Sequence, residues 1–205
     1  MEHCEWGVLI PLSIAQTALL WLLGCSRPDV IVISLDTLRV DHVGAFAEDS
    51  PSKTPNIDAL AQDGVRYTNC YSPISVKGPA FVTLHTGQDP GTHKVFMNVF
   101  RGGAFLKKEA KTLAEKFQHN RYETGGFVSG FTLRRSLGLA QGFDTYDTPP
   151  ITQNRRWGNK TAFKALKWLE KQSGPVFLWY HSYDAHGPWN RWSPMPKSLP
   201  EMTAE

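Results

Sequence analysis

The 205-residue chain is predicted to form an α/β fold in which helices flank a mostly parallel sheet. The runs Val30–Leu35 (VIVISL) and 175–180 (PVFLWY) are apolar without alternation, as in parallel strands that are buried on both faces. Between them, short apolar runs alternate with segments of helical periodicity, which is typical of βαβ units. Polar residues follow directly after both runs, and the ligand sites of such sheets lie beyond the carboxyl ends of their strands.

The chain begins with a segment of a different character. Residues 7–24 are almost entirely apolar and lead into Cys25, an ending that resembles the lipidation signal of bacterial lipoproteins. About 18 apolar residues suit the core of a signal peptide or a short membrane span, although the preceding residues lack the usual Lys or Arg. We expect residues 1–27 to be a signal, lipoprotein-type or membrane-anchor segment, which would export the protein to the membrane, periplasm or exterior. A buried helix is the alternative, and the folded domain is expected to cover 28–205.

The elements between the two buried strands are predicted from local signals. Thr54 and Pro55 have the pattern of an N-cap and a first helical residue, and this helix is expected to end at Gly64. Thr112 and Glu115 match a capping box that starts a helix reaching to about residue 120. The other expected elements are strands at 65–71 and 124–129 and a helix at 159–172, with Phe163, Leu166 and Leu169 on one face. Cys70, in the first of these strands, is expected to be buried rather than reactive.

Composition excludes some functions. A net charge of +3, with basic residues scattered along the chain, does not favour a nucleic-acid partner. The three cysteines have neither the spacing of a metal site nor that of a disulfide framework. With 41% hydrophobic residues, the chain can build a core.

Each buried strand is followed by a cluster of carboxylate and imidazole side chains. The two clusters are Asp36 with Asp41 and His42, and His181 with Asp184 and His186. Because parallel strands end at the same edge of a sheet, both clusters are expected to lie together. Such groups suit a divalent cation and an anionic substrate. For Asp36 alone, a role as the cap of the following turn is the alternative.

Several segments resemble the sulfatase family of the alkaline-phosphatase-like superfamily, in the same order and at similar spacing. They are PDVIVISLDTLRVDHVGAF, GPAFVTLHTG, TLAEKFQHNRYETGGFVSG, GLAQGFDTYD and FLWYHSYDAHGPW. The resemblance covers nearly all of residues 28–190 and implies the amino-terminal part of a catalytic domain. It further implies a metal-dependent hydrolase of sulfate monoesters, with a sulfated small molecule or glycan as substrate.

The resemblance also implies roles for individual residues. Asp36 matches the first metal-binding aspartate of the family, for a divalent cation that is expected to be Ca²⁺. His186 matches the histidine that contacts the sulfate group or the leaving oxygen. His181 and Asp184, in the same cluster, are candidate substrate-binding residues. The chemistry is consistent, because a hard cation neutralises the sulfate oxygens and a histidine donates a proton to the departing alkoxide.

The nucleophile position departs from the family pattern. Sulfatases carry Cys or Ser in a C/S-x-P-S-R motif that runs into L-x-T-G, and residues 84–87 (LHTG) set that register here. Pro79 then aligns with the motif proline, Lys77 stands at the nucleophile position, and Ala80 and Phe81 replace Ser and Arg. An ammonium can bind sulfate as a point charge, but it cannot become the hydroxyl that attacks sulfur. A solvated loop lysine is the alternative.

The family's remaining metal ligands and closing strands lie beyond the matched region. We therefore expect a sheet that is truncated at the carboxyl end, with an unpaired apolar edge, and hydrolysis that is impaired or absent. Three readings stay open: an exported hydrolase, a non-catalytic binder of sulfated or phosphorylated ligands, and an anchored fragment without function. The sequence predicts no oligomeric state.

Overall fold

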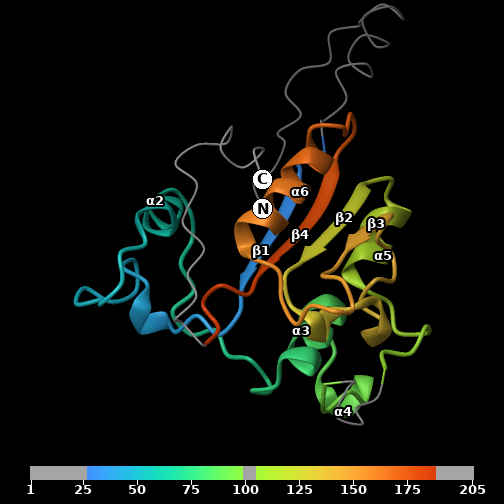
Figure 1. Ribbon diagram of the computed structural model, residues 1–205, viewed down its shortest axis with the longest axis horizontal. Coiled ribbons are helices and arrows are strands. Elements are labelled where there is room, and N and C mark those ends of the chain that lie inside the picture. Colours follow the sequence, from blue (N-terminus) through green and yellow to red (C-terminus); the bar gives the residue numbers. More distant parts are fainter. Residues whose placement is uncertain (1–26, 99–104, 188–205) are drawn as a thin grey trace, which may run out of the picture.

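The computed structural model describes residues 27–98 and 105–187, and its centre is a sheet of four strands in the order β1-β4-β2-β3 (Figure 1). The strands are β1 (Val30–Leu35), β2 (Glu123–Val128), β3 (Thr145–Asp147) and β4 (Val176–Ser182). All three neighbouring pairs are parallel. Together with the flanking helices, this arrangement confirms the predicted α/β fold.

The three predicted helices are present in the predicted order, and two more, α3 (Lys77–Thr86) and α4 (Pro90–His93), lie between the first and second of them. The three are α2 (Pro55–Asp63), α5 (Leu113–His119) and α6 (Gly158–Leu169), with 3-10 turns η1 (Val40–His42), η3 (Phe131–Leu133) and η4 (Arg135–Leu137). The capping box of α5 is formed in both directions, Glu115 N to Thr112 Oγ1 (3.1 Å) and Thr112 N to Glu115 Oε2 (2.8 Å). None of the described helices is long and apolar enough to cross a membrane. Residues 1–26 lie outside the described part, so the predicted export segment stays a prediction.

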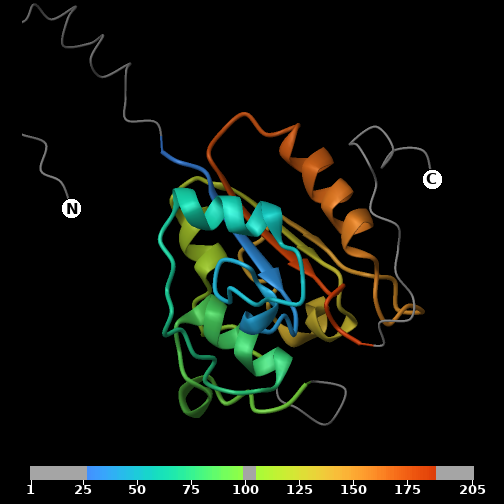
Figure 2. The same cartoon turned by 90° about the vertical axis from the view of Figure 1, so that its left-hand side faces the viewer.

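The central strand β4 divides the core into two layers. Because side chains alternate along a strand, Phe177 and Trp179 point into the larger cluster beneath α3 and α5, and Leu178 packs on the other face against Ala165 of α6. Figure 2 shows α6 on one side of the sheet and α3 and α5 on the other. The continuous apolar run of this strand is explained by these two covered faces.

The face of α6 that meets the sheet differs from the predicted one. The buried residues of α6 are Gly158, Thr161 and Ala165, whereas Phe163, Leu166 and Leu169 are only partly buried. The reason lies in β2, where a Cβ on Gly125 would come within 2.9 Å of the Trp168 ring. Because Gly125 has no side chain, the indole of Trp168 on α6 packs directly against β2.

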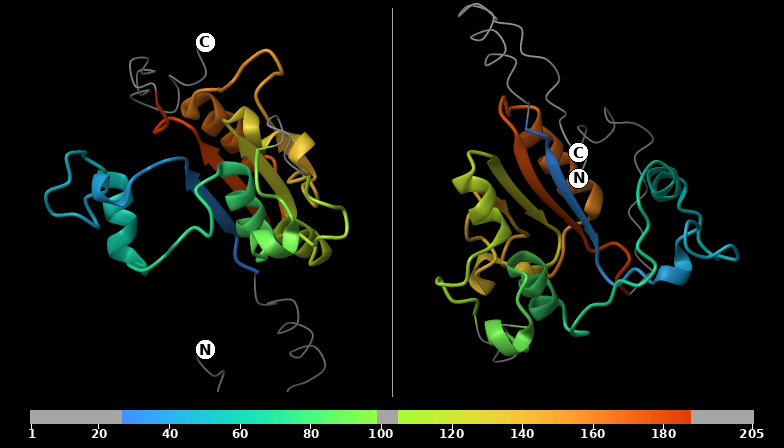
Figure 3. Two further views of the ribbon diagram at one scale, coloured as in Figure 1. Left: turned by 90° about the horizontal axis from the view of Figure 1, so that it is seen from below. Right: turned by 180° about the vertical axis from the view of Figure 1, so that it is seen from behind.

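Residues 65–71, predicted as a strand, form no strand. Val65, Tyr67 and Tyr71 are 76–83% exposed, and Cys70 is exposed rather than buried. Both panels of Figure 3 show the α2 region set apart from the sheet, so this segment has no neighbouring strand with which to pair. Alternation of apolar and polar residues therefore misled the prediction, because a strand also needs a partner.

Strand β1 forms one edge of the sheet and leaves apolar side chains uncovered. Within the described residues it pairs with β4 alone, and Ile31, Ile33 and Leu35 are 38–59% exposed. These three residues share one face, because side chains of a strand alternate. The predicted unpaired apolar edge is thus present in the part of the chain that the structure describes.

Candidate active site

A pocket of about 780 Å³ lies where β1 and β4 end and α3 begins, and Figure 1 shows α3 beyond the carboxyl ends of the strands. Asp36, directly after β1, and Lys77, the first residue of α3, both line it. Tyr183 and His186, which follow β4, complete its polar and aromatic wall. The pocket has the position expected of a ligand site in a parallel sheet.

An ion pair between Asp36 and Lys77 occupies the base of this pocket. Lys77 Nζ lies 2.5 Å from Asp36 Oδ2, and the two side chains are only 9% and 8% exposed. The backbone of Asp36 is held in place because its N–H donates to Ser182 O (3.0 Å), which continues the pairing of β1 with β4. The ammonium also lies 3.6 Å from the centre of the Tyr183 ring, within the range of a cation–π contact.

The surroundings shift the pKa values of two of these groups. Burial lowers the pKa of Lys77, and the neighbouring Asp36 carboxylate opposes that shift through its hydrogen bond and charge. Burial likewise raises the pKa of the Tyr183 hydroxyl, with a further contribution from the negative charge of Asp36. The lysine is therefore a desolvated cation that depends on one carboxylate for its charged state.

Thr37, next to Asp36, adopts a strained backbone conformation. Its φ of 58° lies in the left-handed region, which β-branched residues rarely adopt. Such outliers cluster at functional sites, where the surrounding structure holds them in place. The positive φ of Thr37 turns the chain sharply directly after Asp36. The side chain of Thr37 lines the pocket.

Replacing Thr37 by glycine is expected to raise the free energy of unfolding by about 1 kcal/mol, because glycine adopts positive φ without a steric cost. Chemical denaturation of the two proteins measures the difference. Thr37→Ala is the matched control, since it removes the exposed side chain but keeps a Cβ, and it should not stabilise. An equal gain for both variants would show that the side chain, and not the backbone, causes the effect.

The structure places the two predicted histidines at different depths. His186 lines the pocket and stacks on Tyr183, with ring centres 4.3 Å apart, and its Nδ1 lies 2.7 Å from Gly187 O. His181 is fully buried in β4 and packs edge-on against Phe81 at 5.1 Å. Burial lowers the pKa of His181 to about 3, and the charge of Lys77 adds to the shift. His181 thus lies in the wall behind the pocket as a neutral imidazole.

Asp184 contacts a helix rather than the pocket. Its carboxylate accepts hydrogen bonds from the Gly158 backbone N–H at 2.9 and 3.1 Å, at the start of α6. A Cβ on Gly158 would come within 2.1 Å of Asp184 Oδ2, so this close approach requires glycine. A carboxylate at a helix amino terminus is stabilised by the helix dipole, and Asp184 acts here as a cap for α6.

The other members of the first cluster also lie away from the pocket lining. Asp41 forms an exposed ion pair with Arg39 at 2.6 Å, and His42 Nδ1 lies 2.9 Å from Ser52 Oγ. Of the residues singled out in the sequence, the structure therefore brings Asp36, Lys77 and His186 to the pocket, together with the motif residues Ala80 and Phe81.

Asn98 and Tyr183 are among the pocket residues that the sequence did not identify. Asn98 lines the pocket, and its Oδ1 accepts a 2.8 Å hydrogen bond from the Gly78 backbone N–H in the first turn of α3. No local pattern around Asn98 predicts this contact. Tyr183 stands inside the second polar cluster, between His181 and Asp184, and an aromatic residue among polar ones was the available signal.

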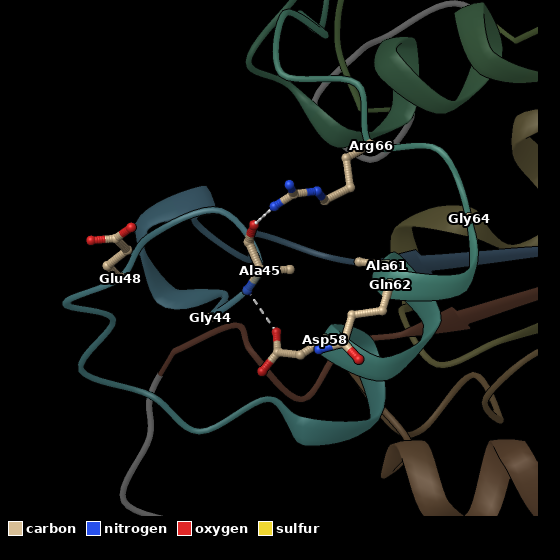
Figure 4. Close-up of a pocket in the computed structure, with 8 residues that line it drawn as sticks. All are labelled: Gly44, Ala45, Glu48, Asp58, Ala61, Gln62, Gly64 and Arg66. Atoms are coloured by element: carbon tan, nitrogen blue, oxygen red, sulfur yellow. Dashed lines mark hydrogen bonds between the residues drawn. The ribbon is translucent and has the colours of Figure 1, made fainter.

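A second hollow, of about 660 Å³, lies between the loop after η1 and α2, and Figure 4 shows its lining. Asp58 Oδ1 accepts a hydrogen bond from Ala45 N at 2.7 Å, and Arg66 donates to Ala45 O. These bonds fasten the loop to α2 and the segment that follows it. Asp36 and Lys77 are absent from this lining, so the hollow is separate from the candidate site.

The pocket does not fit the divalent cation that the family resemblance implies. Hard cations require several oxygen ligands, and Asp36 is the only carboxylate among the described residues that line the pocket. Its Oδ2 is in contact with the Lys77 ammonium. Across residues 27–98 and 105–187, no group of three or more His, Cys, Asp or Glu side chains could hold a metal ion.

Comparison with known proteins agrees with the sequence and the fold. The Sulfatase family model matches residues 28–204. Arylsulfatase A from Bos taurus is 35% identical over 108 residues, which cover 51% of this chain and 21% of that protein. The ulvan-active sulfatase of Formosa agariphila is 29% identical over 175 residues, covering 72% of this chain and 33% of its own.

Solved structures share the fold. BT4656, solved in complex with its substrate D-glucosamine-2-N,6-O-disulfate, has a TM-score of 0.69 at 19% identity, over 80% of this chain and 36% of that one. A protein of the alkaline-phosphatase superfamily from Vibrio parahaemolyticus also shares the fold, with a TM-score of 0.59 at 18% identity, over 85% of this chain and 43% of that one. The chain spans about a third or less of the length of these two curated relatives. It belongs to the sulfatase family.

Proposed function

We propose that this chain binds the sulfate group of a sulfated saccharide or small molecule, and that it does not hydrolyse the ester by the family's covalent route. The observation that carries the proposal is the side chain at the start of α3. There, Lys77 stands where the family motif carries Cys or Ser, and its ammonium is paired with Asp36. The positive charge of Lys77 and its position at the carboxyl ends of the strands favour binding of an anion. The amine of Lys77 is not a hydroxyl nucleophile, which opposes covalent catalysis.

The pocket offers suitable groups for a sulfate monoester. An ammonium carries three N–H donors, so Lys77 can hold Asp36 and still donate to a sulfate oxygen. The imidazole of His186 lines the same pocket and provides a further hydrogen-bonding group near the ester oxygen. Support for a saccharide comes from BT4656, whose substrate is a glucosamine disulfate, and from the ulvan-active sulfatase.

The protonated amine of Lys77 opposes covalent hydrolysis. Attack on sulfur requires a lone pair on the nucleophile, and the nitrogen lone pair of an ammonium is already bonded to a proton. The nearby carboxylate of Asp36 favours the protonated form, because loss of the proton from Lys77 would leave the carboxylate buried without a counter-charge. The site therefore favours binding without turnover.

The first test is hydrolysis of an aryl sulfate by the full protein in the presence of Ca²⁺ or Mg²⁺. We expect no release of the phenol above the rate in buffer. Turnover that disappears in the Asp36→Ala variant would contradict the proposal, because it would show that this pocket performs the reaction.

A second candidate, true hydrolysis, is favoured by one observation. Ser72 and Ser75 line the pocket just before α3, so hydroxyl groups are present near Lys77. Ser72 Oγ donates to Ile74 O at 2.8 Å. If aryl sulfate is turned over, loss of the activity in Ser75→Ala, but not in Ser72→Ala, would identify Ser75 as the nucleophile.

Two further properties belong to the proposal. An exported location follows from the apolar segment at residues 7–24. Detection of a mature chain that starts at Cys25 and carries lipid, by mass spectrometry of the native protein, would support a lipoprotein.

A further inference from the structure

We propose that the Lys77 ammonium is the built-in counter-cation of this site, so that a sulfate ester binds here without a divalent metal ion. This inference rests on the proposed function, since it assumes that the pocket receives a sulfate group. It differs from what the family resemblance implies, which is a metal ion at Asp36. The misfit between the pocket and a metal is its starting point.

The position of the ammonium opposes a divalent cation on the Asp36 carboxylate. Lys77 Nζ lies 2.5 Å from Asp36 Oδ2, and Ca²⁺ binds carboxylate oxygens at about 2.3–2.6 Å. The nitrogen therefore lies at the distance from this oxygen that a calcium ion would take, and it occupies one of the acceptor sites of the carboxylate. A divalent ion on the same carboxylate would lie against a second positive charge in a poorly solvated pocket, where repulsion between cations is strong.

Three separate elements hold the ammonium. Asp36 comes from the end of β1, Tyr183 from the segment after β4, and Lys77 itself from the first turn of α3. The carboxylate and the aromatic face contact the nitrogen at 2.5 and 3.6 Å. With both charged side chains more than 90% buried, this is an ordered cation and not a solvated lysine.

Two backbone N–H groups in the first turn of α3 already have acceptors within the protein. The Gly78 N–H already donates to Asn98 Oδ1 at 2.8 Å, and that of Ala80 donates to Val76 O at 3.1 Å. Pro79, between them, has no N–H. Among the described residues that line the pocket, Lys77 is the one lysine or arginine, so its side chain is the cationic donor for a bound sulfate.

The test is calorimetric binding of phenyl sulfate to the full protein, first with EDTA and then with millimolar Ca²⁺. We expect the same Kd, within about twofold, under both conditions, since the counter-charge is part of the chain. Binding that requires Ca²⁺ would overturn this inference and leave the proposed function standing. Absence of binding under both conditions would overturn the proposed function, and this inference with it.

A variant distinguishes the ammonium from the rest of the pocket. Asp36→Asn/Lys77→Met removes both charges together, so that no buried charge is left unpaired and the fold is retained. It is expected to weaken phenyl sulfate binding at least about tenfold, the contribution of a hydrogen bond to a charged group. Lys111→Met, at an exposed position, is the matched control and should bind as the unmodified protein does. Unchanged binding by the double variant would show that Lys77 is not the partner of the anion.

Discussion

Replacing Lys77 by methionine is expected to lower the free energy of unfolding by about 3–5 kcal/mol, because it leaves the Asp36 carboxylate buried without a partner. Methionine keeps nearly the length and volume of the aliphatic stem, so the loss reports the charge rather than a cavity. Asp36 and Lys77 are 8% and 9% exposed, and water therefore cannot replace the ammonium. Urea denaturation at neutral pH, compared with the unmodified protein, measures the difference.

Two controls accompany this prediction. Asp36→Asn/Lys77→Met should recover most of the lost stability, since a neutral pair needs no counter-charge. Arg39→Met breaks an ion pair that is exposed to solvent, Arg39 with Asp41, and should cause no measurable change. If Lys77→Met were as stable as the unmodified protein, the Asp36–Lys77 pair would contribute nothing to the fold.

Lowering the pH from 7 to 4 is expected to destabilise the protein through two buried histidines. Burial lowers the pKa of His85 to about 4, whereas an unfolded histidine titrates near 6.5. Below pH 6.5 the unfolded chain gains a proton that the folded chain excludes, so stability is lost as the pH falls from 6.5 to 4. The loss from His85 alone is about 3 kcal/mol, and His181, with a pKa of about 3, adds to it.

The position of His85 makes its contribution separable. Its ring lies 4.2 Å from that of Trp179, it is 2% exposed, and neither ring nitrogen has a hydrogen-bond partner among the described residues. His85→Leu should therefore flatten the dependence of stability on pH and raise the stability at pH 7. His119→Leu, at an exposed position on α5, is the control and should leave the slope unchanged. If the dependence of stability on pH were the same in His85→Leu, a group other than His85 would cause it.

Local signals predicted the elements whose formation depends on near neighbours. The capping box joins Thr112 and Glu115, three residues apart, so its two hydrogen bonds are decided within one turn of α5. The strand over Val30–Leu35 has the predicted bounds, because its apolar run is as long as the strand itself. Residues 65–71 have an equally regular pattern and form no strand, since no partner strand lies beside them.

The sequence predicted the position of some candidate site residues and not of others. Asp36, Lys77 and His186 were identified by their places after strands or in motifs, and the structure brings them to one pocket. Asp184 has a similar place in sequence but caps α6 instead. A side chain that follows a strand can turn either to the sheet edge or to a neighbouring helix, and only packing decides which.

The sequence by itself determined the fold class, the family and the substitution at the nucleophile position. Periodicity and ordered motifs carry that information, because they are properties of short segments. Only the tertiary structure decided that the Lys77 ammonium pairs with Asp36, 2.5 Å from its oxygen. The two residues belong to different elements, β1 and α3, and their distance depends on how α3 packs against the sheet. From the sequence, Lys77 could also be a solvated loop residue. In the structure it is a buried counter-ion of Asp36.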